Sequence, residues 1–126
     1  MKRIFLAGSK KFYPKLQTLQ KQLTALGAKP LTTMTGNLDT STQGEISALH
    51  QAFDLILQSD EVYVYAPNGY IGLTVAMEIA YTYANTKPLY SSEKIQDPSV
   101  AELINSVVDI PTYLEKISNS NLTQPR

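Results

Sequence analysis

Residues 61–81 read EVYVYAPNGYIGLTVAMEIAY, and they combine a strand pattern, a turn and a helix pattern. The segment opens with alternating β-branched and aromatic side chains, which are typical of a buried strand. Pro67, Asn68 and Gly69 then predict a turn, and the small and apolar residues from Gly72 onward predict a helix. Because a strand, a glycine turn and a helix N-terminus often bind an anion or a polar ligand, the segment also predicts a binding site.

Glu78 is the one charged residue between Glu61 and Lys87. Its neighbours along the predicted helix are apolar, so the pattern favours a nucleophile or an acid–base group in a polar pocket over a solvated surface glutamate. A carboxylate in apolar company has a partner or a raised pKa. We therefore expect Thr74, one turn earlier, or a backbone amide to hydrogen-bond to Glu78 and keep it ionised.

The residues before this segment predict two strands and two helices. Residues 3–8 form an apolar run that predicts a central strand, and residues 30–34 predict a weaker one. Between them, a helix begins at Pro14, ends at Gly27 and has an apolar stripe made by Leu16, Leu19, Leu23 and Leu26. The second helix is expected to begin with a capping box of Thr42 and Glu45, with a stripe made by Ile46, Leu49, Phe53 and Leu57.

The residues after Ala84 continue the alternation of strands and helices. Residues 87–91 predict a strand, Asp97 and Pro98 predict a helix start, and residues 107–110 predict a short fifth strand. The apolar face of the helix would be Val100, Leu103, Ile104 and Val107. Residues 111–117 predict a last short helix, and the polar residues 118–126 are expected to form a mobile tail.

Alternating strands and helices predict an α/β fold with a parallel sheet and right-handed crossovers. We expect four or five strands, helices on both faces, and a three-layer flavodoxin-like or Rossmann-like order. Residues 1–117 would form a single domain.

Several further residues are candidates for ligand contacts at the carboxyl edge of such a sheet. Gly8 and Ser9 follow the first strand, and Asn68 and Gly69 follow a neighbouring one, so the two loops are expected to face each other beside Glu78. Tyr70 could stack on a flat ligand. The complete set of predicted binding residues is Gly8, Ser9, Asp60, Asn68, Gly69, Tyr70, Gly72 and Thr74.

Five polar residues have competing interpretations. Asp60 could reach a sugar hydroxyl or could instead end a helix, and Asp39 lies in a polar loop that could cover the pocket. Lys10 and Lys11 could neutralise a phosphate, although exposed lysines are common. For His50 a structural role is favoured over a catalytic one.

The composition excludes several classes of protein. The 126 residues contain equal numbers of acidic and basic side chains, no cysteine and one histidine. Disulfides, thiolate sites and a structural zinc are therefore excluded or strongly disfavoured, and we expect no metal and no cofactor. The balanced charge does not indicate nucleic-acid binding, and no apolar run reaches the length of a membrane span. A cytoplasmic protein is expected.

These motifs together suggest a family. Residues 5–9 (FLAGS), Ser59-Asp60 before a strand, and the Thr74-x-x-x-Glu78 helix followed by Lys87-Pro88 resemble the nucleoside 2-deoxyribosyltransferase-like superfamily, which includes deoxynucleoside monophosphate N-glycosidases. The resemblance implies a flavodoxin-like fold, a homodimer or higher homo-oligomer, and a nucleoside or nucleotide as the small-molecule partner. It implies that Glu78 attacks the anomeric carbon of the sugar, with Gly8 and Ser9 beside the sugar or phosphate.

The sequence also departs from the family pattern. Phe5 stands where the family often has a tyrosine, and Asn68 stands where an aspartate usually orients the sugar. The chain is also shorter at its end than the transferases, so hydrolysis is as plausible as transfer. The Pro-x-Gly-x-x-Gly turn also resembles nucleoside monophosphate phosphoribohydrolases. The alternatives are a non-catalytic module that binds a nucleotide or nucleotide-sugar, and a structural protein whose tyrosine-rich third helix is a dimer face.

Overall fold

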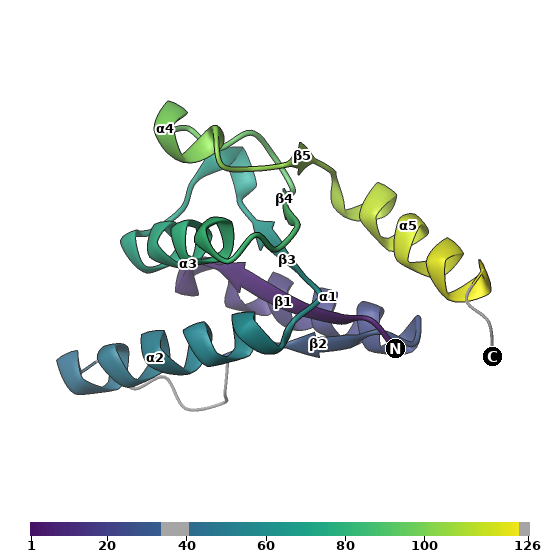
Figure 1. Cartoon of the computed structure of the whole chain (residues 1–126), viewed down its shortest axis with the longest axis horizontal. Coiled ribbons are helices and arrows are strands. Elements are labelled where there is room, and N and C mark those ends of the chain that lie inside the picture. Colours follow the sequence, from purple (N-terminus) through teal and green to yellow (C-terminus); the bar gives the residue numbers. More distant parts are fainter. Residues whose placement is uncertain (34–40, 124–126) are drawn as a thin grey trace.

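A five-stranded, entirely parallel sheet organises the protein, with strand order β2-β1-β3-β4-β5. The computed structural model describes residues 1–33 and 41–123 (Figure 1). The strands are β1 (Arg3–Gly8), β2 (Lys29–Leu31), β3 (Glu61–Tyr65), β4 (Leu89–Ser91) and β5 (Ser106–Val107). The helices are α1 (Tyr13–Ala25), α2 (Thr42–Gln58), α3 (Leu73–Ala84), α4 (Pro98–Ala101) and α5 (Ile110–Thr123), with short 3-10 helices η1 (Lys10–Phe12) and η2 (Pro67–Gly69). The predicted three-layer α/β fold with flavodoxin-like order is confirmed.

The two faces of the sheet have separate apolar cores. Ile4 and Leu6 of β1 pack with side chains of α1 and α5, whereas Phe5 and Ala7 pack with side chains of α2 and α3. Successive side chains of a strand point to opposite faces, so one apolar run supplies both cores. This places α1 and α5 on one face and α2 and α3 on the other (Figure 1).

A buried polar cluster fixes α5 to the amino end of the sheet. The Glu61 carboxylate is 2.9 Å from the Lys2 ammonium and accepts a 2.5 Å hydrogen bond from the Tyr113 hydroxyl. The ring of Tyr113 stacks on Tyr63 at 4.0 Å, and the Tyr63 hydroxyl donates to the carbonyl of Val108. Burial raises the pKa of both tyrosine hydroxyls well above their ordinary value. These contacts provide partners for the Glu61 carboxylate, whose burial without partners would cost free energy.

Lys87, part of the Lys-Pro pair noted in the sequence, stabilises the end of α2. Its ammonium donates to the carbonyls of Leu57 at 3.0 Å and Ser59 at 2.7 Å. A cation at a helix C-terminus satisfies carbonyls that have no partner within the helix.

The structure corrects two expectations for α2. Ser41, not Thr42, caps the helix, because the Ser41 hydroxyl accepts a hydrogen bond from the Gly44 amide. The buried residues are Ala52 and Ile56, whereas Ile46 and Leu57 of the expected stripe are exposed. Apolar residues occur on more than one side of this helix, so the spacing alone did not identify the side that packs on the sheet.

The expected bounds of the last two helices were also wrong. Helix α4 ends at Ala101, because Asn105 already pairs with Leu89 of β4 through its amide nitrogen and its side chain. Helix α5 continues to Thr123, beyond the predicted end at residue 117, since no glycine or proline interrupts residues 112–123. In the part of the chain that the structure describes, no helix is long and apolar enough to cross a membrane.

Candidate active site

A pocket of about 500 Å³ lies over the carboxyl end of β1, between α2 and α3. Strand β1 pairs with β2 on one side and β3 on the other, so the chain changes direction across the sheet at this point. Parallel α/β sheets bind ligands at such a switch point. Of the predicted site residues, those that line the pocket are Gly8, Ser9, Gly72, Thr74 and Glu78.

Glu78 is the most buried of the described charged residues that line this pocket, with 7% of its surface exposed. Among residues 1–33 and 41–123, its carboxylate has no hydrogen bond or ion pair, although Thr82 donates to its backbone carbonyl. Burial therefore raises the pKa of Glu78 from its ordinary value to about 7. The expectation that Thr74 or an amide keeps this carboxylate ionised is corrected: no described group does so.

The raised pKa predicts that the Glu78→Gln variant is more stable than the wild type at high pH only. Below the ordinary value of 4.5 the carboxyl is neutral in the folded and unfolded states, so its burial costs little. As the pH rises from 4.5 to about 7, the folded protein loses stability, because the carboxyl ionises at a lower pH in the unfolded chain than in the folded one. The expected advantage of the variant is about 3 kcal/mol near pH 8.5 and close to zero near pH 4.

Chemical denaturation at a series of pH values measures this difference. Glu115→Gln is a matched control, since Glu115 is exposed on α5 and far along the chain from the pocket. If the stability difference between Glu78→Gln and the wild type does not change with pH, the buried environment described for Glu78 is wrong.

Gly8 and Ser9 line the pocket together with Glu78. A Cβ atom on Gly8 would lie 2.7 Å from a methyl of Leu16 and 3.3 Å from the carbonyl of Tyr65, so the chain packs closely here. The Ser9 hydroxyl accepts a hydrogen bond from the Lys11 amide at 3.3 Å and caps η1. The Ser9 hydroxyl can also donate a hydrogen bond, for which a hydroxyl or phosphate oxygen of a ligand is a suitable acceptor.

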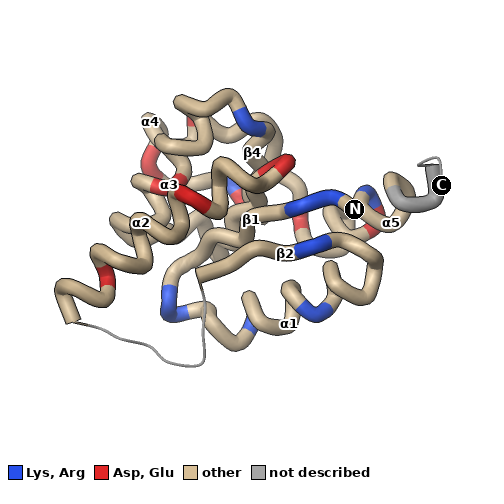
Figure 2. Tube along the Cα trace, turned by 60° about the horizontal axis from the view of Figure 1, so that its bottom comes forward, with Lys and Arg blue, Asp and Glu red and all other residues tan. Residues whose placement is uncertain are grey.

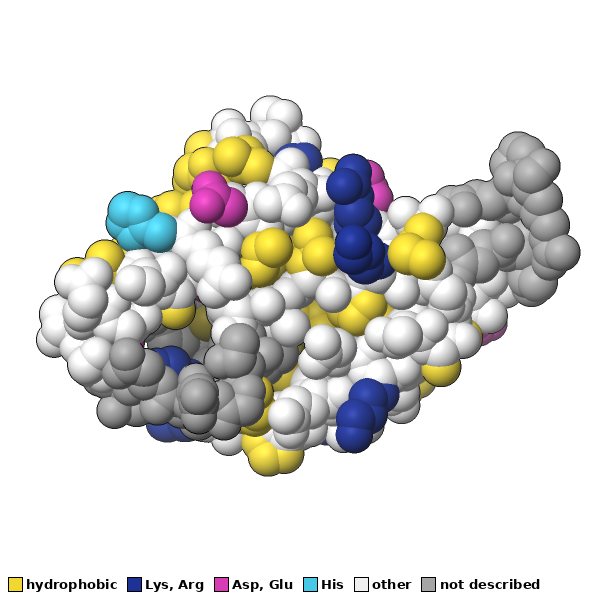
Figure 3. Space-filling view, turned by 90° about the horizontal axis from the view of Figure 1, so that it is seen from below, with side chains coloured by type: hydrophobic (Ala, Val, Ile, Leu, Met, Phe, Trp, Pro, Cys, Tyr) yellow, Lys and Arg dark blue, Asp and Glu magenta, His cyan; other side chains and the backbone are white. Residues whose placement is uncertain are grey.

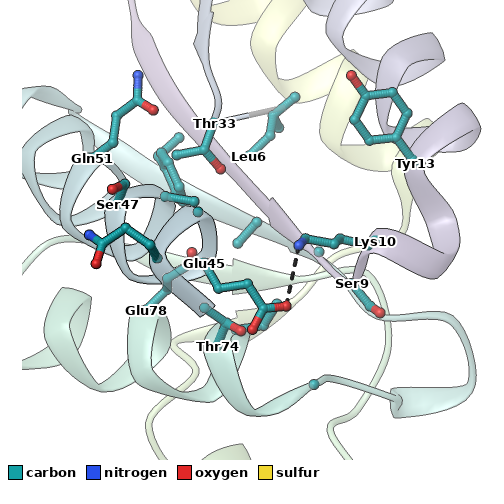
Figure 4. Close-up of a pocket in the computed structure, with 18 residues that line it drawn as sticks. Leu6, Ser9, Lys10, Tyr13, Thr33, Glu45, Ser47, Gln51, Thr74 and Glu78 are labelled. Carbon is teal, nitrogen blue, oxygen red and sulfur yellow. Dashed lines mark hydrogen bonds and ion pairs between the residues drawn. The ribbon is translucent and has the colours of Figure 1, made fainter. Parts of the chain in front are cut away.

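The two lysines after Ser9 have different environments. Lys10 lines the pocket, and its ammonium is 3.5 Å from the Glu45 carboxylate of α2 (Figure 4). Lys11 lies over the ring of Tyr70, 4.3 Å from its centre, and does not line the pocket. Only Lys10 is therefore placed to meet a ligand.

The turn after β3 is not brought to the pocket. Asn68 donates its amide to Glu93 and accepts at its carbonyl from Gln96, so the turn is bound to the segment after β4. Tyr70 packs edge-on against Phe12. Asn68, Gly69 and Tyr70 are absent from the pocket lining.

Asp60 and His50 are also absent from the pocket lining. The Asp60 carboxylate accepts a 2.7 Å hydrogen bond from the Arg3 amide, at the amino end of the sheet and so opposite the pocket. His50 is exposed on α2, as Figure 3 shows in cyan. Asp39 lies outside the described residues. No group of histidine, aspartate and glutamate side chains in the described ranges could hold a metal ion.

Sequence reasoning missed several residues that line the pocket. They include Phe5, Tyr13, Thr33, Glu45, Ser47 and Gln51. Phe5 was noted as a departure from a family pattern, and Glu45 was interpreted as a capping residue. For the residues on α2, the signal that could have found them is the series of polar side chains Gln43, Glu45, Ser47 and Gln51 along this helix.

Comparison with solved structures agrees with this fold. The chain is similar to a CMP N-glycosidase from Clostridium botulinum, with TM-score 0.63 and 18% identity over 94% of this chain and 99% of the other. It is similar to a 2-deoxyribosyltransferase from Bacillus psychrosaccharolyticus, with TM-score 0.63 and 16% identity over 93% and 90%. A conserved protein from Enterococcus faecalis gives TM-score 0.64 and 17% identity over 95% and 99%.

The chain therefore has the fold of these proteins, which confirms the fold implied by the resemblance of its sequence to the nucleoside 2-deoxyribosyltransferase-like superfamily. No protein-family model matches the chain, and no curated protein matches it. At 16–18% identity the structural likeness establishes the fold, and the activity has to be inferred from the pocket.

Proposed function

We propose that the protein cleaves or transfers at the N-glycosidic bond of a (deoxy)nucleoside or nucleoside monophosphate, with Glu78 as the nucleophile. The observation that carries this proposal is the buried Glu78 carboxylate, which opens into a pocket at the switch point of the sheet beside Gly8 and Ser9. The neighbours named as a CMP N-glycosidase and a 2-deoxyribosyltransferase support the same bond as the target.

The reaction would proceed in two displacements. Ionised Glu78 attacks the anomeric carbon while the bond to the base breaks, and the base leaves with the bonding electrons and takes up a proton. The resulting ester between Glu78 and the sugar is then opened by water, which gives hydrolysis, or by a second base, which gives transfer. Either step returns the free carboxylate.

The environment of Glu78 suits a nucleophile that is used near neutral pH. With a pKa of about 7, roughly half of the protein holds the ionised form at pH 7. An ionised carboxylate with few hydrogen bonds is more reactive than a fully solvated one. The polar side chains of Ser9, Thr74 and Gln51 line the same pocket and supply hydrogen bonds for sugar hydroxyls.

A panel of nucleosides and nucleoside monophosphates tests the proposed reaction. We expect chromatography to detect free base from at least one substrate, and a second base added to the mixture distinguishes transfer from hydrolysis. If none of the substrates releases base, the proposed reaction is wrong.

The second candidate is a module that binds a nucleotide or nucleotide-sugar without turnover. It is favoured by one observation: no described side chain or amide holds Glu78 in its ionised form. A neutral carboxyl can donate a hydrogen bond to a ligand and need not react with it. Thermal stabilisation by a ligand without base release would identify this function.

We also propose that the protein assembles as a homodimer through the outer face of α3. Leu73 and Tyr83 on this face are 78% and 58% exposed, and Met77 lies between them. The helix has no charged residue except the buried Glu78, so two copies of this face can pair without like-charge repulsion.

Substitution of Leu73 by aspartate tests the dimer. The variant is expected to run as a monomer at concentrations where the wild type is a dimer, because each subunit would bring an unpaired charge into the interface. Light scattering after size exclusion measures both masses. Leu57→Asp on α2 is the control, and a monomeric wild type would contradict the proposal.

A further inference from the structure

The charges around the pocket are unequal. Of the described side chains that line it, Lys10 is positive, and Glu45 and Glu78 are carboxylates. Helices α2 and α3, which form two of its walls, contain no lysine or arginine. Figure 2 shows the same separation, with basic residues on β1, β2 and α1 and acidic residues on α2 and α3. The pocket therefore offers one cation against two carboxyl groups.

The single cation is already paired. The Lys10 ammonium is 3.5 Å from Glu45, and both side chains are partly exposed, so the pair lies where solvent meets the pocket. Figure 4 shows this pair joining the loop after β1 to the first turn of α2. An anionic ligand that approached Lys10 would have to displace the Glu45 carboxylate or remain beside it.

The deeper part of the pocket also opposes a second anion. A phosphate dianion near Glu78 would favour the neutral form of this carboxyl, whose pKa burial has already raised to about 7. The first-turn amides of α3 have no side-chain cap and offer a partial positive charge. That charge amounts to about half an elementary charge, which is less than a dianion needs.

Resting on the proposed function, we propose that Glu45 is a specificity-determining residue that makes the pocket select a neutral (deoxy)nucleoside over its 5′-monophosphate. Glu45 does so by holding Lys10 and by placing its own negative charge at the pocket. The neutral 5′-hydroxyl of a nucleoside can instead donate to Glu45 or accept from Lys10, and the ion pair stays in place.

The test compares the four common deoxynucleosides with their 5′-monophosphates. Calorimetry gives the dissociation constants, and chromatography gives base release from the same samples. The wild type is expected to prefer the nucleoside. Glu45→Gln is expected to shift the binding ratio toward the monophosphate by about fivefold, because Lys10 becomes free.

Two further variants separate the mechanism from a general change in charge. In the double variant Lys10→Gln/Glu45→Gln the gain for the monophosphate is expected to disappear. Asp54→Asn removes a carboxylate from the same helix at an exposed position outside the pocket lining, and its binding ratio is expected to equal that of the wild type.

Each contrary result has a distinct meaning. Tighter binding of the monophosphate by the wild type overturns the role of Glu45, and base release from that monophosphate would leave the proposed reaction intact. The role of Glu45 is also overturned if Glu45→Gln leaves the binding ratio unchanged or if Asp54→Asn shifts this ratio equally. It is overturned as well if neither the nucleoside nor the monophosphate binds. Nucleoside-selective binding without any base release supports the selectivity and contradicts the reaction.

Discussion

Glu78→Gln is expected to lower base release by a factor of about a thousand or more, because glutamine cannot form the glycosyl ester. The amide has nearly the same shape as the carboxylic acid and fits the same buried site. Its neutrality also removes the cost of burying a charge, so the variant should fold at least as stably as the wild type. Loss of activity together with a stable fold would show that Glu78 is required for the reaction and not for folding.

The pH dependence of the wild type provides an independent readout. If Glu78 attacks in its ionised form, kcat/KM for a neutral nucleoside rises as the pH increases through about 7. A fall over the same range would indicate a proton donor instead of a nucleophile. Glu115→Gln serves as the control for loss of a carboxylate, and full base release by Glu78→Gln would disprove the mechanism.

Gly69→Ala is expected to destabilise the protein by about 4 kcal/mol, which combines a strained backbone with a steric clash. Gly69 has φ of +76°, a conformation that side chains rarely adopt, and it is buried. A Cβ atom there would lie 2.2 Å from the carbonyl of Lys94 and 3.0 Å from the amide of Gln96. Both neighbours are backbone atoms, so neither can rotate away.

Gly72→Ala is the matched control for this substitution, three residues along the same loop. Gly72 has φ of −84°, and a Cβ atom on it would meet nothing within 4 Å. The free energy of unfolding of the Gly72→Ala variant should stay within about 0.5 kcal/mol of the wild-type value. Thermal unfolding measures both, with an expected drop of about 15 °C for Gly69→Ala. Equal stabilities of the two variants would contradict the described turn.

The arrangement of the sheet could be predicted from the sequence because its signals are local. The apolar runs at residues 3–8 and 61–65 are bounded by glycine or by turn residues, and helices of clear spacing separate them. The orientation of α2 could not be predicted in this way. Ile46 and Leu57 match the helical spacing as well as Ala52 and Ile56 do, and only contact with β1 and α3 decides which pair is buried.

Part of the candidate site could likewise be predicted from the sequence, and part of it could not. Glu78 and Gly8 could be predicted to line a pocket, because the carboxyl end of β1 and the start of α3 meet wherever the sheet is parallel. The position of Asn68 depends on Glu93 and Gln96, which lie far along the chain and turn its loop away from the pocket. Glu45 was missed because a charged residue in a first helical turn already has a sufficient local explanation.

The cluster around Glu61 has a consequence for the order of folding during synthesis. Lys2 precedes Glu61 in the chain and Tyr113 follows it by 52 residues, yet both bind the carboxylate of the central strand. Until α5 emerges, this carboxylate lacks its phenol partner, and the ring of Tyr63 lacks the ring that covers it. All the described residues that line the pocket therefore precede α5 in the chain, whereas the polar cluster at the amino end of the sheet needs a residue of α5.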